Sequence, residues 1–425
     1  MKEQLLHYIW QHKLFNTTEL KTTTGSELQI IDFGRYNTDG GPDFLNAKIR
    51  IDDVILAGTI ELHVYASDWN LHRHQNDRKY DNVILHVVYF NDVLIQQLPT
   101  LELNGRIPMI LLDRYDAMMQ SHQRLICGNS IQSADFFMLE KWKERLIIER
   151  LERKAGDILM NLASNGNDWE QTCYQLLGKY FGSHINKEPF EQLTRLLDYK
   201  LLMKHKTDSF QLEALLFGVA GFLNKDFVEI YPRGLKEEYQ FLKHKYGLKQ
   251  MYEHEWQFLR IRPVSFPTIR IAWFAQFIRQ MPFLHKIIET DLFDSINETV
   301  AVSDYWGNHY VFDKMSKLKP KKMGHDFKAV LQINVFIPLL YAYGKYSSSE
   351  KFIEKAIDLL RQIPPEQNSK TAVFEEAQLA SHHAFDSQAY MELFDNYCAR
   401  KRCLQCAVGH KILSNTGSKI SMNIV

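Results

Sequence analysis

The sequence predicts an α/β amino-terminal domain followed by a mostly α-helical domain. Between residues 27 and 90, short segments rich in β-branched and aromatic residues alternate with turn clusters such as NTDGGP, a pattern typical of strands. From about residue 134, apolar residues recur at helical spacing instead. Because 425 residues exceed one ordinary core, we expect one domain over 1–130 and a second over 131–425, with a further division near 250 left open.

Composition narrows the class of protein. Apolar residues make up 45% and aromatic residues 12% of the chain, which is typical of a folded soluble protein. The 51 Lys and Arg balance the 51 Asp and Glu, so no global positive field draws the chain to nucleic acid or to a membrane. No apolar run approaches the roughly 20 residues of a membrane-spanning helix. We therefore expect a cytoplasmic protein with no membrane partner; its oligomeric state stays open.

The amino-terminal elements follow in a definite order. Leu5, Leu6, Ile9 and Trp10 lie at helical spacing and predict a first helix. Four predicted strands come next: ELQIIDFG (27–34), DFLNAKIRI (43–51), AGTIELHVYA (57–66) and NVILHVVYF (82–90). A polar crossover, SDWNLHRHQNDRKYD, separates the last two, and a further strand is expected near IQQLPTLEL.

The carboxyl-terminal elements are amphipathic helices. LEKWKERLIIERLERKAGDILMNLA combines apolar residues at helical spacing with several Glu and Arg or Lys pairs four residues apart, and both features favour a helix. Further helices are expected at FQLEALLFGVAGFL, RIAWFAQFIRQM, VLQINVFIPLLYAYG and SSSEKFIEKAIDLLRQI.

Polar side chains on two adjacent predicted strands form the first candidate site. Strand alternation places Glu61 and His63 on the same face of AGTIELHVYA, and a hairpin would lay Asp43 beside them. Two such carboxylates suit Mg²⁺ or Mn²⁺ and leave room for water and a phosphate. By the same alternation Asp43 shares a face with apolar residues, so it must lie at the strand mouth or on a bulge to join the site. The alternative is that Asp43 caps a turn and the other two form a solvated sheet face.

The pattern Pro42-Asp43 with Glu61-Leu62-His63 resembles that of the PD-(D/E)XK nuclease superfamily. Its core runs helix, three strands, helix, strand, with Pro-Asp at the second strand and Glu-x-Lys on the third. The resemblance implies a mixed-sheet, restriction-endonuclease-like core in which Asp43 and Glu61 bind the metal. His63 stands where the superfamily has lysine, so it could act as a general base, as a cation at low pH or as a nitrogen ligand for a softer metal.

A cluster of histidines in the crossover suggests a second interpretation. His72 and His74 could chelate zinc on an extended segment, with His63 or His86 as a third ligand, which would indicate a zinc-dependent hydrolase. In the nuclease interpretation, His72, His74 and Tyr80 instead support the metal or contact substrate phosphate. Histidines near aromatic residues also serve as packing groups, and His86 in an apolar strand fits that role.

Three cysteines near the end of the chain form another candidate site. YCARKRCLQCAVGH places Cys398, Cys403 and Cys406 in a C-x4-C-x2-C pattern. With Cys127 or His410 as a fourth ligand they could hold an iron–sulfur cluster or a structural zinc. Some nucleases with the core named above hold a cluster through one distant and three close cysteines, though at other spacings. Buried thiols without metal are the alternative.

Arginines among aromatic residues mark a local surface for nucleic acid. Arg260, Arg262 and Arg270 lie in FLRIRPVSFPTIRIAWFAQFIRQ, and guanidinium groups suit phosphate oxygens. Ion pairs between packed helices would use the same residues.

Four runs resemble an uncharacterised bacterial family described as a domain of unknown function; these are GGPDFLNAKI, GTIELHVYASDWNLHRHQND, YDNVILHVVYFND and YCARKRCLQCAVGH. The expected function is a divalent-metal-dependent phosphodiesterase acting on nucleic acid, with Asp43 and Glu61 holding Mg²⁺ or Mn²⁺ and His63 activating water. Two alternatives stay open. One is a catalytically inactive module that binds nucleic acid or scaffolds proteins, and the other is the zinc hydrolase.

Overall fold

The chain divides into two compact units. The computed structural model describes all residues except 129, 132–134, 282–283, 285–299 and 416–425. The first unit comprises Met1–Trp142, Val373–Leu379 and Leu393–Val425, and the second comprises Lys143–Ala372 and Ala380–Glu392. The 29-residue helix α4 (Phe136–Ser164) begins in the first unit and continues into the second. The expected domains, 1–130 and 131–425 with a possible division near 250, stay predictions.

The first unit contains a mixed sheet, as expected. Its strands follow the order β1-β2-β4-β5-β6-β7, with β3 paired to β4. β4 is antiparallel to both β2 and β5, whereas β5, β6 and β7 run parallel. The strands are β1 (Leu20–Lys21), β2 (Glu27–Asp32), β3 (Arg35–Tyr36), β4 (Phe44–Ile51), β5 (Val54–Tyr65), β6 (Val83–Phe90) and β7 (Thr100–Glu102). β1 and β3, each of two residues, were not predicted.

Helix α1 (Glu3–Gln11) packs against β5. Its apolar side chains, among them Leu6, Ile9 and Trp10, are fully buried, which agrees with the predicted amphipathic pattern. On β5 the residues from Ile60 to His63 are buried on both faces of the strand, because the sheet is covered there. The crossover to β6 contains the short helix α2 (Asp68–Leu71) and two 3-10 turns, His74–Asn76 and Arg78–Tyr80.

The carboxyl-terminal segment returns to the first unit. Helix α17 (Ala407–Ser414) contacts α3 (Met109–Gln120). The Arg114 guanidinium donates a hydrogen bond to the Ile412 carbonyl at 3.1 Å, and the Tyr8 hydroxyl lies 2.8 Å from His410 Nδ1. The sequence had placed all residues after 130 in a helical domain, because local patterns do not indicate which core a helix joins.

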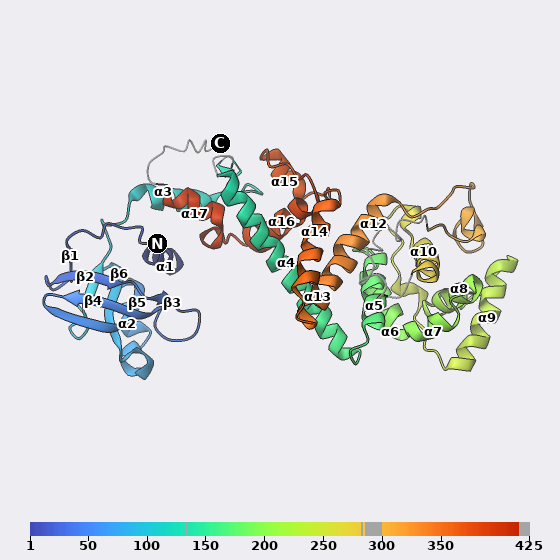
Figure 1. Cartoon of the computed structure of the whole chain (residues 1–425), viewed down its shortest axis with the longest axis horizontal. Coiled ribbons are helices and arrows are strands. Elements are labelled where there is room, and N and C mark those ends of the chain that lie inside the picture. Colours follow the sequence, from blue (N-terminus) through green and yellow to red (C-terminus); the bar gives the residue numbers. More distant parts are fainter. Residues whose placement is uncertain (129, 132–134, 282–283, 285–299, 416–425) are drawn as a thin grey trace. The chain divides into compact units, whose positions relative to one another are not determined.

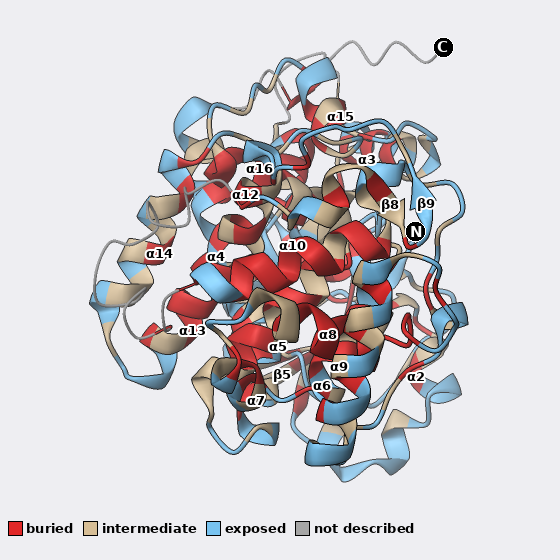
Figure 2. Ribbon diagram, turned by 90° about the vertical axis from the view of Figure 1, so that its right-hand side faces the viewer, coloured by how far each residue is buried: buried red, intermediate tan, exposed pale blue. Residues whose placement is uncertain are grey.

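The second unit is mostly helical, and its core is built around α8 and α10, whose residues are largely buried (Figure 2). It also holds a two-stranded sheet of β8 (His309–Val311) and β9 (Lys314–Met315). Its helices are α5 (Trp169–Phe181), α6 (Lys187–Leu196), α7 (Tyr199–Lys204), α8 (Ser209–Val219), α9 (Ile230–Tyr246), α10 (Pro267–Gln280), α12 (His325–Leu331), α13 (Ile337–Tyr346) and α14 (Glu350–Gln362). α15 (Thr371–Glu376) and α16 (Ala384–Leu393) follow near the boundary between units (Figure 1).

One helical stretch is longer and more apolar than the sequence had suggested. α12 and α13 join through a π-helical turn into a continuous stretch, His325–Tyr346, whose 22 residues and mean hydropathy of 1.2 would allow it to cross a membrane. Of its apolar window, 67% is buried inside the protein. A buried core helix passes the same test of length and composition, so this stretch is weak evidence for a membrane span.

Candidate metal centre

Asp43 and Glu61 lie beside each other on adjacent strands. The backbone N–H of Asp43 donates to Glu61 Oε2 at 3.1 Å, and the N–H of Leu62 donates to Asp43 Oδ2 at 2.9 Å. Asp43 immediately precedes β4, and the register between β4 and β5 shifts between Phe44 and Ala47, where Asn46 takes a left-handed φ of 60°. Asp43 thus occupies the strand mouth next to a bulge, which is the position that strand alternation required of it.

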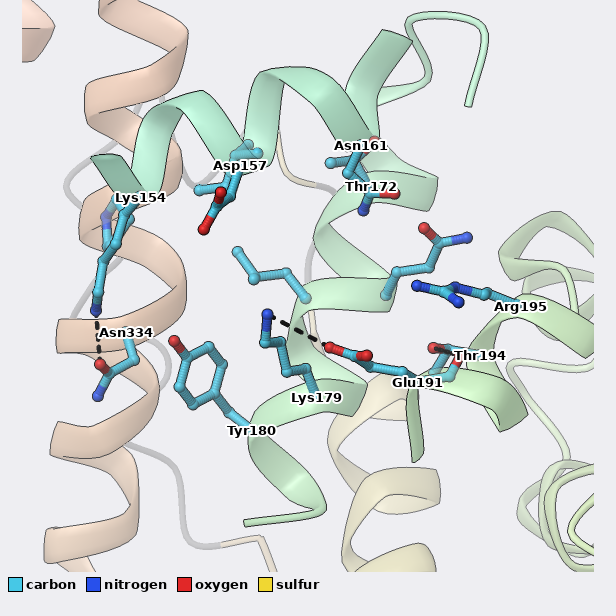
Figure 3. A pocket seen from close by; sticks show the side chains of 14 residues that line it. Lys154, Asp157, Asn161, Thr172, Lys179, Tyr180, Glu191, Thr194, Arg195 and Asn334 are labelled. Carbon is cyan, nitrogen blue, oxygen red and sulfur yellow. Dashed lines mark hydrogen bonds and ion pairs between the residues drawn. The ribbon is translucent and has the colours of Figure 1, made fainter. Parts of the chain in front are cut away.

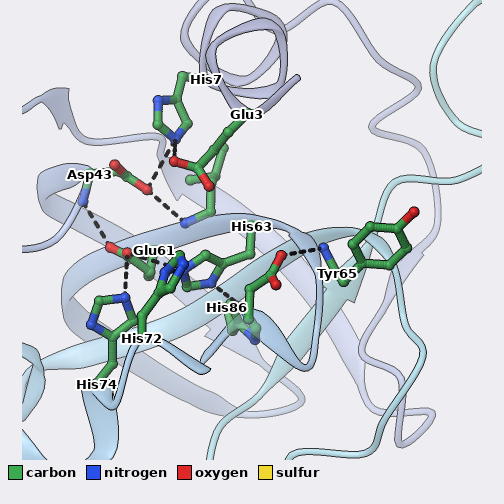
Figure 4. A network of polar contacts seen from close by, with 11 residues as sticks. Glu3, His7, Asp43, Glu61, His63, Tyr65, His72, His74 and His86 are labelled. Carbon is green, nitrogen blue, oxygen red and sulfur yellow. Dashed lines mark hydrogen bonds and ion pairs between the residues drawn. The ribbon is translucent and has the colours of Figure 1, made fainter. Parts of the chain in front are cut away.

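Three histidines converge on Glu61 (Figure 4). His63 Nε2 lies 3.2 Å from His72 Nδ1 and 3.6 Å from Glu61 Oε1, and His74 Nε2 lies 3.3 Å from the same oxygen. One ring nitrogen from each histidine falls within 4.8 Å of the other two. His63 is buried, His74 is partly exposed and His72 is exposed, so the cluster reaches from the core to the surface.

The chain between His72 and His74 is turned so that both side chains enter the cluster. α2 ends at His72, and Arg73 adopts a left-handed conformation with φ 61° and ψ 31° before the next 3-10 turn begins at His74. Such a conformation strains a residue with a Cβ by about 1 kcal/mol or more. Strain of this kind persists only where the surrounding contacts enforce it, and it concentrates at functional sites.

A second layer of side chains fixes the histidine rings. His63 Nδ1 lies 2.9 Å from His86 Nε2 on the parallel strand β6. If His86 accepts this hydrogen bond, His63 carries its proton on Nδ1 and presents the Nε2 lone pair to the cluster. Tyr80 lies over His74 with 3.8 Å between ring centroids, and Trp69 contacts both His74 and His86. His86 and Tyr80 are therefore packing groups that also orient the cluster.

The protonation states follow from burial and from like charges. Burial, and next the Asp43 carboxylate, raise the pKa of Glu61 to about 9. Burial and the neighbouring histidines, His86 foremost, lower the pKa of His63 to about 2. Burial lowers the pKa of His86 to about 4 and that of His74 below its ordinary value. The buried histidines are thus neutral near pH 7, the form in which imidazole binds a metal.

Three of the separations within this cluster suit the ligands of a single transition-metal ion. A tetrahedral site with bonds of about 2.0–2.1 Å has about 3.4 Å between ligand atoms, and the three separations around Glu61 Oε1 and His63 Nε2 are 3.2, 3.3 and 3.6 Å. His74 Nε2 is buried and makes no hydrogen bond, so an ion would satisfy it. Imidazole ligands suit zinc and related metals better than Mg²⁺.

Two residues of α1 belong to the same network, and the sequence analysis missed both. His7 Nε2 lies 3.2 Å from Asp43 Oδ2 and 3.9 Å from Glu3 Oε1. Glu3 and His7 are one helical turn apart, which aligns them on one face. A histidine within the buried run LLHYIW was the available signal, because a polar side chain on the apolar face of a helix needs a partner.

The predicted arginines belong to the second unit, whereas this network belongs to the first. Arg260 and Arg262 are exposed. Arg270 instead packs inward, with its guanidinium 4.3 Å from the centroid of Phe327 and 5.3 Å from that of Trp273. Burial lowers the pKa of Arg270 to about 10. Arg270 is therefore a packing group rather than a surface ligand for phosphate.

A polar cleft of about 270 Å³ also lies in the second unit (Figure 3). Lys179 and Glu191 form an ion pair across 3.4 Å there, and Lys154 Nζ donates to Asn334 Oδ1 at 2.7 Å. These charges already have partners within the cleft. It therefore offers weaker grounds for a function than the histidine cluster.

Cys127, Cys398, Cys403 and Cys406 line one small cavity in the first unit. His410, the other candidate for a fourth ligand, instead faces Tyr8 and lies near His12, with 4.4 Å between the centroids of the tilted rings. The structure thus brings the distant cysteine, rather than the histidine, to the three close ones.

Comparison with known proteins gives one match. A family model described as a protein of unknown function (DUF2851) matches residues 3–369, a range that includes the whole histidine cluster and ends before the three close cysteines. No curated protein and no solved structure matches the chain. Because the model covers most of the sequence, the chain belongs to the DUF2851 family.

Proposed function

We propose that this protein is a metal-dependent phosphodiesterase that acts on nucleic acid and holds a transition-metal ion through His63, His72, His74 and Glu61. The observation that carries the proposal is the convergence of their ligand atoms: three of the separations are 3.2–3.6 Å, and one nitrogen from each histidine lies within 4.8 Å of the other two. When bound, such an ion polarises a phosphoryl oxygen and makes water a better nucleophile.

The low pKa of His63 decides among the roles open to it. A ring that stays neutral down to a pH of about 2 cannot supply the positive charge of a lysine near pH 7. Its Nε2 atom also lies beside His72 and Glu61, where it can bind an ion together with them. The role that remains is that of a nitrogen ligand, which favours Zn²⁺ or Mn²⁺ over Mg²⁺; Mg²⁺ and Mn²⁺ were the two ions first considered.

The remaining residues have separate tasks in the proposed reaction. Asp43 is the carboxylate outside the nitrogen cluster, held by the Leu62 N–H and close to His7. It accepts the proton of the attacking water as the new bond from oxygen to phosphorus forms and the bond from phosphorus to the sugar oxygen breaks. Arg73, Arg78 and Lys79 are exposed on the same crossover, where they can neutralise phosphate oxygens.

The order of elements supports a restriction-endonuclease-like core. Helix α1, the antiparallel strands β2, β4 and β5, the short helix α2 and the parallel strand β6 follow the order helix, three strands, helix, strand. Asp43 stands at the second of these strands and Glu61 on the third. This agreement favours nucleic acid over other substrates of metal-dependent hydrolases.

Cleavage assays with matched variants test the proposal. Purified protein is incubated with single- and double-stranded DNA and RNA in Mn²⁺, Zn²⁺ or Mg²⁺, beside Asp43→Ala, Glu61→Ala and His72→Ala. His244→Gln, an exposed histidine of α9 in the second unit, serves as the control. We expect cleavage by the wild type and the control, with stronger cleavage in Mn²⁺ or Zn²⁺ and loss in the three site variants.

Equal residual cleavage in all proteins would refute the proposed site. Stoichiometric binding of the ion without any cleavage would favour the alternative of an inactive nucleic-acid-binding or scaffolding module. Cleavage of a different ester or amide, lost together with zinc in His72→Ala and His74→Ala, would favour the zinc hydrolase.

A further inference from the structure

The four cysteines of the first unit form a closed group although they are far apart in the sequence. Cys127 follows α3, Cys398 ends a π-helical turn, Cys403 begins a 3-10 turn and Cys406 directly precedes α17. All four line the same small cavity, together with Met118 and Ile126. Four of the chain's five cysteines thus meet at one place.

Electrostatic interactions also place these thiols close together. After burial, which is the main cause, the other three cysteines raise the pKa of Cys398. Burial, with Cys406 and Cys403, raises the pKa of Cys127 to about 12. Without a metal, thiols in apolar surroundings stay protonated and inert. Such thiols gain little from lying beside one another, so a shared ligand is the better explanation for the meeting of four.

The backbone around Cys403 and Cys406 is shaped to support sulfur ligands. Burial raises the pKa of the Cys406 thiol, and the backbone N–H groups of Val408 and Gly409, at the start of α17, act in the opposite direction. A helix amino terminus stabilises a thiolate in this position. A Cβ at Gly409 would overlap the Cys403 carbonyl oxygen, so glycine is needed for the chain to fold this tightly around the cavity.

The four thiols surround a cavity rather than a point. In a tetrahedral zinc site with bonds of about 2.3 Å, neighbouring sulfurs are about 3.8 Å apart, and such a site leaves no space between them. Here the cysteines line a shared cavity together with apolar side chains, which suits a cluster of several atoms better than a single ion.

We propose that Cys127, Cys398, Cys403 and Cys406 hold an iron–sulfur cluster. Four thiolates are the usual ligands of such clusters, and the apolar cavity excludes competing water. The cluster joins the turn after α3 to the carboxyl-terminal segment 270 residues later in the sequence, and it thereby secures α17 in the first unit. The proposal is independent of the histidine site.

Metal and sulfide analysis of the full chain tests this proposal. Protein is purified without oxygen from iron-supplemented cells and assayed for iron, acid-labile sulfide, zinc and visible absorbance. We expect iron and sulfide in equal amounts and a brown protein. Cys398→Ser and Cys406→Ser should lose the sulfide, whereas Cys173→Ser, a buried cysteine of α5, should retain it.

The wild-type measurement keeps the test decisive if a serine variant does not fold. Wild-type protein that contains zinc or no metal, and no sulfide, overturns the proposal, as does sulfide that persists in both serine variants. His72→Ala should keep its iron and sulfide, because a single-ion site of histidines binds no sulfide. This control separates failure of the cluster from failure of the phosphodiesterase proposal.

Discussion

The two candidate metal sites of the first unit differ in ligand chemistry and in access to solvent. The histidine site offers nitrogen and oxygen atoms and includes the exposed His72. The cysteine site offers sulfur alone; Cys403 and Cys406 are each 8% exposed, and Cys127 and Cys398 are half-buried. Reactive metal sites keep a position open to substrate, whereas structural sites are closed. Within the first unit, the histidine site is thus suited to reaction and the cysteine site to stabilising the fold.

The sharpest test of this difference is removal of metal by a chelator. An ion at the exposed site should dissociate and be captured, whereas a cluster in a closed cavity should resist. Incubation of holoprotein with EDTA should abolish nearly all phosphodiesterase activity and leave iron, sulfide and visible absorbance unchanged. Activity and absorbance are measured in the same samples. Loss of activity and absorbance at the same rate would show that the chelator reaches the two sites equally well.

A second test uses the pH dependence of metal-free protein. The folded-state pKa of His86, about 4, lies below its ordinary value of 6.5 because the ring is buried. The stability contributed by the neutral ring is therefore complete above about pH 6.5 and is lost as the pH falls toward 4, by about 3 kcal/mol. His63 extends the loss to lower pH.

Hydrogen exchange of β5 and β6 between pH 7 and 4 measures this effect in chelated protein. Protection should fall with acidification in the wild type and in His244→Gln, and less steeply in His86→Asn. Helix α13 contains no histidine and no carboxylate, so its exchange serves as an internal reference. Unchanged protection of β5 and β6 down to pH 4 would contradict a buried neutral histidine cluster.

The contrast between the two sites also shows what sequence patterns can predict. Strand alternation placed Glu61 and His63 together, and the requirement for a strand mouth or bulge located Asp43 where β4 begins. Alternation is local and has a fixed period, so it is readable in one sequence. Two other features depend on the fold, and no local pattern encodes them. One is the left-handed conformation of Arg73, which turns His74 into the cluster, and the other is the contact of His7 with Asp43.

The same limit applies to the elements and to the cysteines. Four strands, the first helix and the long helix α4 were predicted because their periodicity is strong. The return of α17 to the first unit was not, since an amphipathic helix does not specify its partner. The C-x4-C-x2-C pattern singled out three cysteines, but whether Cys127 or His410 lies beside them depends on how distant parts of the chain fold together.

A third test concerns the support of the histidine site. His86→Phe removes the nitrogen beside His63 Nδ1, whereas His86→Asn keeps an oxygen that can accept the hydrogen bond. Loss of such outer support typically weakens metal affinity by about 10–100-fold. We expect this loss for His86→Phe in a titration with Zn²⁺ or Mn²⁺, a smaller loss for His86→Asn, and unchanged iron and sulfide in both. Equal affinity in the two variants would mean that His86 only fills space.

The smallest expected effect comes from Arg73. Arg73→Gly removes the strain of a left-handed residue, about 1 kcal/mol, and adds chain entropy to the unfolded state, which offsets part of that gain. The metal-free variant should therefore be as stable as the wild type or slightly more stable in denaturant titrations. Its affinity for the ion should be unchanged, because glycine adopts the same φ readily. Cleavage should nevertheless weaken, since Arg73 is proposed to contact phosphate. Arg73→Lys keeps both the charge and the strained conformation, so it separates the effect of the charge from the effect of the strain. A variant that binds and cleaves as the wild type does would restrict Arg73 to shaping the loop, and would leave Arg78 and Lys79 as the cations beside the histidine site.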